Sequence, residues 1–183
     1  MRDIVERAMH GDREAFGLLV GRTVDRMYAI ATRILRDSDL AEDAVQTALI
    51  AAWRQLPGLR DPDKFEAWER KLVVHACYAE YNRRRRRRAN VRALQFDDAS
   101  DDAGLLSVAE RDALDRAFSS LSVEQRAVFV LHHHVGLSLV EVGETLGIPA
   151  GTARSRLHYA TRTLQAIVSD EASPAPSAEG RTA

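Results

Sequence analysis

Apolar residues recur at helical spacing along most of the chain, and alternation with period two is almost absent. We therefore expect an all-α fold. In the first half the pattern predicts four helices. The first spans about Ile4–Met9, the second runs from Asp12 through Leu35, the third from Ser38 or Asp39 through Trp53, and the fourth from about Lys64 into Arg83–Arg88. Asp12 can cap the second of these, and Asp39 or Ser38 the third. Proline and glycine predict a loop over Leu56–Asp63.

The second half continues the helical pattern after a polar gap. Two further helices are expected around Val108–Ser119 and Val123–His133. Ser122 and Gln125 have the spacing of a capping box, in which each side chain satisfies the other residue's backbone N–H.

The stretch Gly136–Leu164 predicts two helices joined by a tight turn. Ser138 and Glu141 form a second capping box, Gly147 suits the left-handed end of the first helix, and Pro149 suits the start of the next one. This is the pattern of a helix-turn-helix, whose second helix lies in the DNA major groove.

The second helix of that pair has one apolar stripe and one polar face. Ala153, Leu157, Ala160 and Leu164 repeat at helical spacing and are expected to be buried. Arginine can bind guanine bidentately, and Ser, His and Tyr can reach phosphates or base edges. The candidate DNA-reading residues are Thr152, Arg154, Ser155, Arg156, His158, Tyr159 and Arg162. A solvated face on an ordinary helical hairpin is the alternative.

Composition places these helices in two small domains. The predicted divisions are a first domain at 1–90, an acidic, flexible linker at 91–107, a second domain at 108–168 and a disordered Pro/Ser/Ala-rich tail at 169–183. The chain lacks an apolar run of the ~18 residues that a membrane span needs, and Met1–Arg7 lacks a secretory core. A soluble, cytoplasmic protein is expected, without membrane insertion. Because Cys77 is the only cysteine, a disulfide framework is excluded.

Charge is distributed unevenly behind a net value of −1. Arg83–Arg88 places six arginines in a row at the predicted end of the fourth helix. Such a run predicts a salt-sensitive clamp for phosphates, with a solvated charge run as the alternative. Trp53, Phe65 and Trp68 flank the loop; aromatic side chains there can stack on unpaired bases, although aromatics at helical spacing are more often buried in the core.

Catalysis and metal binding are not indicated. His132, His133 and His134 are consecutive, so on a helix they point about 100° apart and cannot converge on one ion. Patterns for a Ser/His/Asp triad, a phosphate-binding loop or a zinc protease are missing. We expect a protein that is not an enzyme, with no cofactor, no metal and no small-molecule substrate.

Two segments together carry a resemblance to a known family. Asp39–Trp53, with Phe65, Trp68 and the basic helix end, resembles region 2 of bacterial sigma factors. Leu121–Leu131 with Gly136–Leu164 resembles region 4. Their order and spacing are similar to those of the extracytoplasmic-function (ECF, group 4) sigma factors of the sigma-70 family.

The resemblance implies a role for each segment. The helix bearing Asp39, Glu42, Asp43, Gln46 and Trp53 is expected to dock on the β′ clamp helices of core RNA polymerase, and region 4 on the β flap. The helix from Thr152 is expected to read the −35 element of promoter DNA. Residues implied in recognising and melting the −10 element are Leu59, Arg60, Lys64, Phe65, Trp68, Lys71, His75, Arg83 and Arg84.

The function predicted is therefore promoter-specific transcription initiation, controlled by an anti-sigma factor. Two other interpretations are compatible with the residues alone. One is a stand-alone helix-turn-helix regulator that binds palindromic sites as a dimer. The other is a helical adaptor whose arginines bind RNA or an acidic protein.

Overall fold

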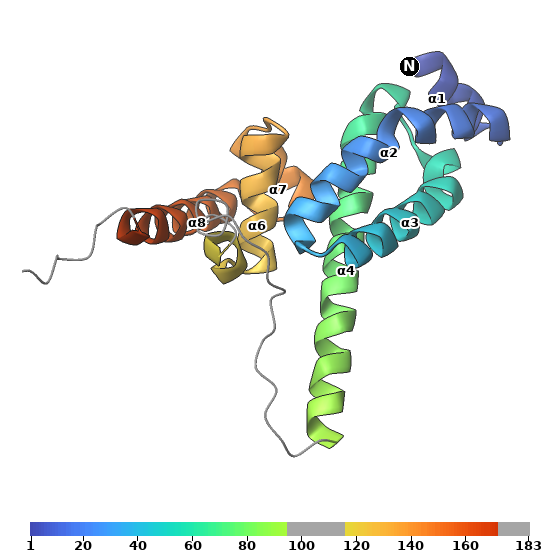
Figure 1. Ribbon diagram of the computed structural model, residues 1–183. Coiled ribbons are helices and arrows are strands. Elements are labelled where there is room, and N and C mark those ends of the chain that lie inside the picture. The colour runs from blue at the N-terminus through green and yellow to red at the C-terminus, as the bar shows by residue number, and fades with distance from the viewer. Residues whose placement is uncertain (95–115, 172–183) are drawn as a thin grey trace, which may run out of the picture.

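The computed structural model describes residues 1–94 and 116–171, and within these ranges the regular elements are all helical (Figure 1). The first half contains α1 (Arg2–Met9), α2 (Arg13–Leu35), α3 (Ser38–Gln55), the 3-10 turns η1 (Leu56–Gly58) and η2 (Pro62–Lys64), and α4 (Phe65–Leu94). The second contains α6 (Val123–Phe129), the π-helical turn η3 (Val130–His134), α7 (Leu139–Leu146) and α8 (Ala150–Glu171). The all-α prediction is confirmed.

Two helices extend past positions at which the sequence predicts a division of the chain. The fourth helix continues through Leu94, past the expected boundary at 90, and α8 continues to Glu171, past the expected boundary at 168. Most of the predicted linker and tail lies outside the described residues. So does most of the helix expected over 108–119, of which residues 116–120 are described as helical.

Most of the predicted caps are present. Asp12 Oδ1 accepts a hydrogen bond from the Ala15 amide at 3.0 Å. The capping boxes at Ser122 and Ser138 both form completely.

The predicted cap of α3 was wrong. Asp37, rather than Ser38 or Asp39, accepts the Leu40 amide at 2.9 Å, because Asp37 is still extended while its two successors already belong to the first turn. Partial burial alone would raise the pKa of Asp37, but the Leu40 hydrogen bond and the Arg84 guanidinium outweigh it and hold that pKa below its ordinary value.

The helix-turn-helix is formed by α7 and α8. Gly147 ends α7 with φ +66°, in the left-handed region that favours glycine. Gly143 allows the turn to fold back on α7, since a Cβ there would lie 2.7 Å from the Ile148 carbonyl oxygen. The predicted stripe of α8 is mostly buried: Ala153 and Ala160 are fully covered, Leu164 nearly so, and Leu157 partly.

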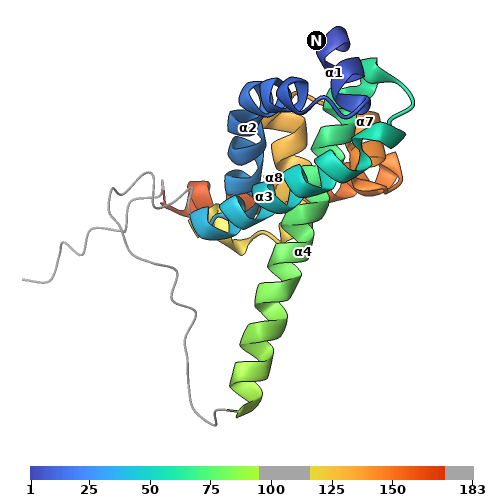
Figure 2. The same ribbon diagram turned by 90° about the vertical axis from the view of Figure 1, so that its right-hand side faces the viewer.

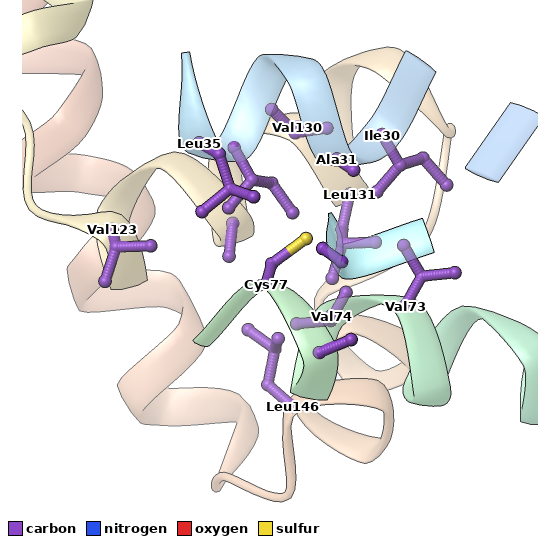
Figure 3. Packing of buried hydrophobic residues seen from close by; sticks show 14 of the residues in the cluster. Ile30, Ala31, Leu35, Val73, Val74, Cys77, Val123, Val130, Leu131 and Leu146 are labelled. Atoms are coloured by element: carbon purple, nitrogen blue, oxygen red, sulfur yellow. The ribbon is translucent and has the colours of Figure 1, made fainter. Parts of the chain in front are cut away.

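The two halves pack against each other rather than standing apart. A single hydrophobic cluster contains Ile34 and Cys77 from the first half and Val128, Leu131 and Val142 from the second. Figure 3 shows Cys77 of α4 with side chains of both halves around it. The C-terminal part of α4, with the arginine run, projects away from this body in both ribbon views (Figures 1 and 2).

Candidate nucleic-acid interface

The predicted DNA-reading face of α8 is open to solvent. Arg154, Ser155, His158, Tyr159 and Arg162 are exposed, and Tyr159 retains 60% of its accessible surface. Thr152 and Arg156 are half-buried. The exposed row therefore presents two guanidinium groups, an imidazole and two hydroxyls beside each other on one helix, a set of groups suited to phosphates and base edges.

The acidic face of α3 is a second exposed surface. Asp39, Glu42, Asp43 and Gln46 are all exposed, while Ala41, Ala44, Val45 and Ala48 face the core. Trp53 lies two turns beyond Gln46 and is 38% exposed, with its ring edge-on to Phe16 at a centroid distance of 4.9 Å. This face offers carboxylates and an amide beside an accessible aromatic ring, and so fits a basic protein surface better than DNA.

The turn before α4 and the start of that helix form a third surface. Arg60, Lys64, Lys71 and His75 are exposed, and Leu59 is half-buried. Asp61 caps η2 by accepting the Asp63 amide at 3.0 Å, which fixes the loop that presents the basic side chains. The exposed cations Arg60, Lys64 and Lys71 thus lie in the loop and the first turns of the helix whose far end carries the arginine run.

Comparisons with known proteins bear directly on this arrangement. Residues 19–87 match the model of Sigma-70 region 2, and residues 117–166 match that of Sigma-70, region 4. The ECF RNA polymerase sigma factor SigM of Mycobacterium tuberculosis is 32% identical over 158 residues, covering 86% of this chain and 79% of that protein. The RNA polymerase sigma-E factor of Streptomyces avermitilis is 31% identical over 156 residues, covering 85% and 86% respectively. The chain belongs to the ECF sigma factors. It directs transcription from promoters together with RNA polymerase, in a class of initiation factors that are not themselves enzymes.

Solved structures agree with the fold of this sigma factor. The sigma factor RpoE of Bartonella quintana, solved with the anti-sigma factor NepR, gives a TM-score of 0.67 at 21% identity, covering 84% of this chain and 96% of that one. CnrH, solved with the cytosolic domain of CnrY, gives 0.66 at 25% identity and covers 93% and 97%. Both likenesses extend over the two halves of the ECF factor.

The two aromatic side chains predicted at the −10 surface are less exposed than the basic ones. Phe65 is only 3% exposed and packs with Val5, Leu19 and Leu56, so its ring is not available to a base in this conformation. Trp68 is half-buried, with its ring centroid 5.9 Å from that of Phe65. Phe65 therefore supports the surface from beneath, and Trp68 is the aromatic group closer to solvent.

The arginine run divides into a tied and a projecting part. Arg83 pairs with Glu80 and lies 3.3 Å from Asp43 of α3, and Arg84 pairs with Asp37. Arg85, Arg86, Arg87 and Arg88 are exposed on the projecting helix. The first two arginines thus brace α4 against α3, and the others present positive charge away from the body of the sigma factor.

Sequence reasoning missed two residues between the halves. Arg126 is 6% exposed and donates to three backbone carbonyls, one of them in the other half. The Tyr78 hydroxyl is buried without a hydrogen-bond partner beside the second half. The sequence does not indicate either role, because an arginine in a helix is usually at the surface and a tyrosine in a helix is usually an ordinary core residue.

Within the described residues, His, Cys, Asp and Glu side chains form no group that could hold a metal ion. His132 Nδ1 lies 2.7 Å from the Leu137 carbonyl, so this histidine ties η3 to the approach of α7. Among the same residues, none of the helices is both long and apolar enough to span a bilayer.

Proposed function

We propose that this ECF factor, of group 4, holds promoters at two points while it is bound to core RNA polymerase. The exposed acidic face of α3 docks on the β′ clamp helices, and the second half docks on the β flap. The −10 element is opened along the loop and the exposed side of α4, and the −35 element is read by α8. RNA synthesis is catalysed by the polymerase, so the factor itself needs no catalytic group or cofactor. The complex acts in the cytoplasm.

The observation that carries this proposal is the exposed row on α8. Arg154 and His158 lie one helical turn apart and are both exposed, and the side chains behind them are packed against α6 and α7. A helix so supported can enter the major groove without disturbing its own core. The exposed face of α3 lies on a different helix, so both contacts can be made by one chain.

An anti-sigma factor is proposed as the regulator. RpoE and CnrH, the two solved structures described above, were each solved in complex with a protein partner, and the partner of the sigma factor RpoE is an anti-sigma factor. Since this chain shares their fold across both halves, a partner that covers α3 or α8 would prevent initiation by occupying the surfaces that polymerase and DNA require.

In vitro transcription with core polymerase on fragmented genomic DNA tests the proposal. Wild-type protein should produce defined start sites with shared upstream elements. The double variant Arg154→Ala/His158→Ala should lose initiation that depends on the −35 element, because loss of one bidentate arginine contact costs about 1–3 kcal/mol, or roughly 5- to 150-fold in affinity. Its binding to core polymerase should be unchanged.

The matched control is Arg13→Ala, an exposed arginine at the start of α2, far along the chain from α8. It should leave start sites and yield as in wild type. Failure of the wild-type protein to start transcription at any site, with tight binding to duplex DNA in the absence of polymerase, would support a stand-alone regulator instead.

A further inference from the structure

The chain contains two lysines, and both lie where α4 begins. Of its 26 lysines and arginines, 24 are arginines, and the two exceptions are Lys64, the last residue of η2, and Lys71, in the second turn of α4. Seven residues of helix rise about 10 Å, so the two amines belong to one short stretch of the molecule. The proposed function assigns this stretch to the −10 element.

Lysine and arginine differ in the chemistry that can remove their charge. The amine of lysine is a common target of acylation, whereas the guanidinium of arginine stays protonated and does not share this reactivity. Acylation turns the amine into a neutral amide, so the site loses a positive charge. In this chain an acylating reagent can therefore neutralise part of the −10 surface while the arginines of α8 and of the run Arg83–Arg88 keep their charge.

Both lysine amines are open to a reagent. Lys64 and Lys71 are exposed, and within the described residues neither side chain has a hydrogen bond or an ion pair. The carboxylates just before Lys64 have other partners, since Asp61 accepts the Asp63 amide and Asp63 pairs with Arg2 at 2.5 Å. An ion pair would hold an amine as its unreactive ammonium, and here none competes with the reagent.

The carboxylates at the start of α4 are also engaged elsewhere. Glu66 and Glu69 both pair with Arg26 of α2, at 3.0 and 3.2 Å, and Glu69 is only 3% exposed. Neither carboxylate pairs with Lys71, although both lie within five residues of it in sequence. The charge of this lysine is therefore available to a phosphate of DNA, and its removal by acylation would weaken that contact.

The thiol of the chain does not compete for the reagent. Cys77, the only cysteine, is fully buried. Burial raises the pKa of its thiol to about 12, so little thiolate forms at neutral pH. In the folded protein the amines that remain for acylation are those of the two lysines and the amino terminus.

We propose that Lys64 and Lys71 form a modification site, acylated by acyl phosphates, that weakens the opening of the −10 element. The neutral Nζ attacks the acyl carbon, and a C–N amide bond forms as the C–O bond to the phosphate breaks. Inorganic phosphate leaves with the electron pair of that bond, and the amine proton passes to solvent. The inference rests on the proposed function for its effect on promoters, whereas the modification itself does not.

Acetyl phosphate is the probe for this site. The full-length protein is treated with it, the reagent is removed, and peptide mass spectrometry locates and counts the acetyl groups. We expect acetylation of Lys64 and Lys71, with Cys77 unmodified until the protein is unfolded in guanidinium. Treated and untreated protein are then compared in transcription with core polymerase. Loss of two phosphate contacts should lower the yield by on the order of 10-fold.

Two variants isolate the effect of the lysines. Lys64→Arg/Lys71→Arg keeps both charges but cannot be acetylated there, so treatment should not change its yield, whatever that yield is at the start. The control adds Arg13→Lys to this double variant, because Arg13 is exposed at the start of α2. It should gain an acetyl group at position 13, again without a change in yield on treatment. All of these proteins have the amino terminus, so its acetylation cannot explain a difference between them.

The outcomes distinguish the modification from the proposed function. Wild-type lysines that stay unmodified under conditions that acetylate position 13 of the control overturn the proposal. So does a wild-type yield that is unchanged with both lysines acetylated, or one that falls equally in Lys64→Arg/Lys71→Arg. If no protein starts transcription before or after treatment, the proposed function fails. The modification is then decided by mass spectrometry alone: acetylation of Lys64 and Lys71 at least as fast as at position 13 supports it, and slower acetylation overturns it.

Discussion

At the scale of single residues, Gly143 and Gly147 shape the turn between α7 and α8. The first lacks a side chain where the chain folds back on α7, and the second adopts a positive φ that ends the helix. The DNA-reading face of α8 depends on this turn for its direction, because α8 begins only three residues after Gly147. A small change at Gly143 therefore acts on both stability and DNA binding.

Gly143→Ala should destabilise the protein. The new Cβ would lie 2.7 Å from the Ile148 carbonyl and 3.3 Å from the Ala150 amide nitrogen, which are backbone atoms that cannot turn away. Overpacking of this kind costs about 1–3 kcal/mol, measurable by urea unfolding.

Gly151→Ala is the matched control for that substitution. Gly151 lies in the first turn of α8 and a Cβ there meets nothing within 4 Å, so alanine should be neutral or stabilising by up to about 1 kcal/mol. Equal stability of the two variants would contradict the close approach of the turn backbone to Gly143.

Local signals were enough to predict the caps at Asp12, Ser122 and Ser138, since each depends on residues within one turn. They were not enough for α3, where three candidate caps are consecutive and the choice depends on the backbone after α2. Arg36 there adopts φ +56°, and its sequence gives no hint of this. The burial of Phe65 was equally hidden, because its partners Val5 and Leu19 are distant in sequence.

At the scale of elements, α4 combines three roles along one helix. Its start presents basic groups beside the loop, its middle fills the core shared by the halves, and its end carries the arginine run. The sequence predicts the helix and the charge, but not that Arg83 and Arg84 are held by α3 while the following arginines project. That division follows from the crossing of α3 and α4, which is a long-range contact.

Arg86→Ala/Arg87→Ala should weaken the binding of the polymerase holoenzyme to promoter DNA and reduce its salt dependence. If both arginines neutralise phosphates, the slope of log affinity against log salt concentration should fall by about 2. Binding isotherms at several salt concentrations measure this.

Arg22→Ala serves as the control for the arginine pair, since Arg22 is exposed on α2, outside the projecting helix. It should leave the slope unchanged. A slope unaffected in the double variant would mean that the run is a solvated charge cluster without DNA contact.

At the scale of the whole molecule, the main departure from expectation is the shared core. Composition and charge predict two domains on a tether, and region 2 and region 4 are indeed the two matched units. Their packing against each other cannot be recognised in the sequence. An apolar helix stripe buried between the two halves has the same residue pattern as one buried within a single half. The two units are therefore separate in sequence and continuous in their hydrophobic core.

A shared core predicts that the free protein unfolds in one cooperative transition. Both tryptophans, Trp53 and Trp68, lie in the first half, so their fluorescence reports that half, whereas far-UV circular dichroism reports all helices. The two probes should give coincident urea midpoints in wild type. Arg126→Met weakens the coupling between the halves, so the transitions should separate, with part of the helical signal lost before the fluorescence changes. Arg162→Met should keep them coincident, and separate midpoints in the wild-type protein would contradict a core common to both halves.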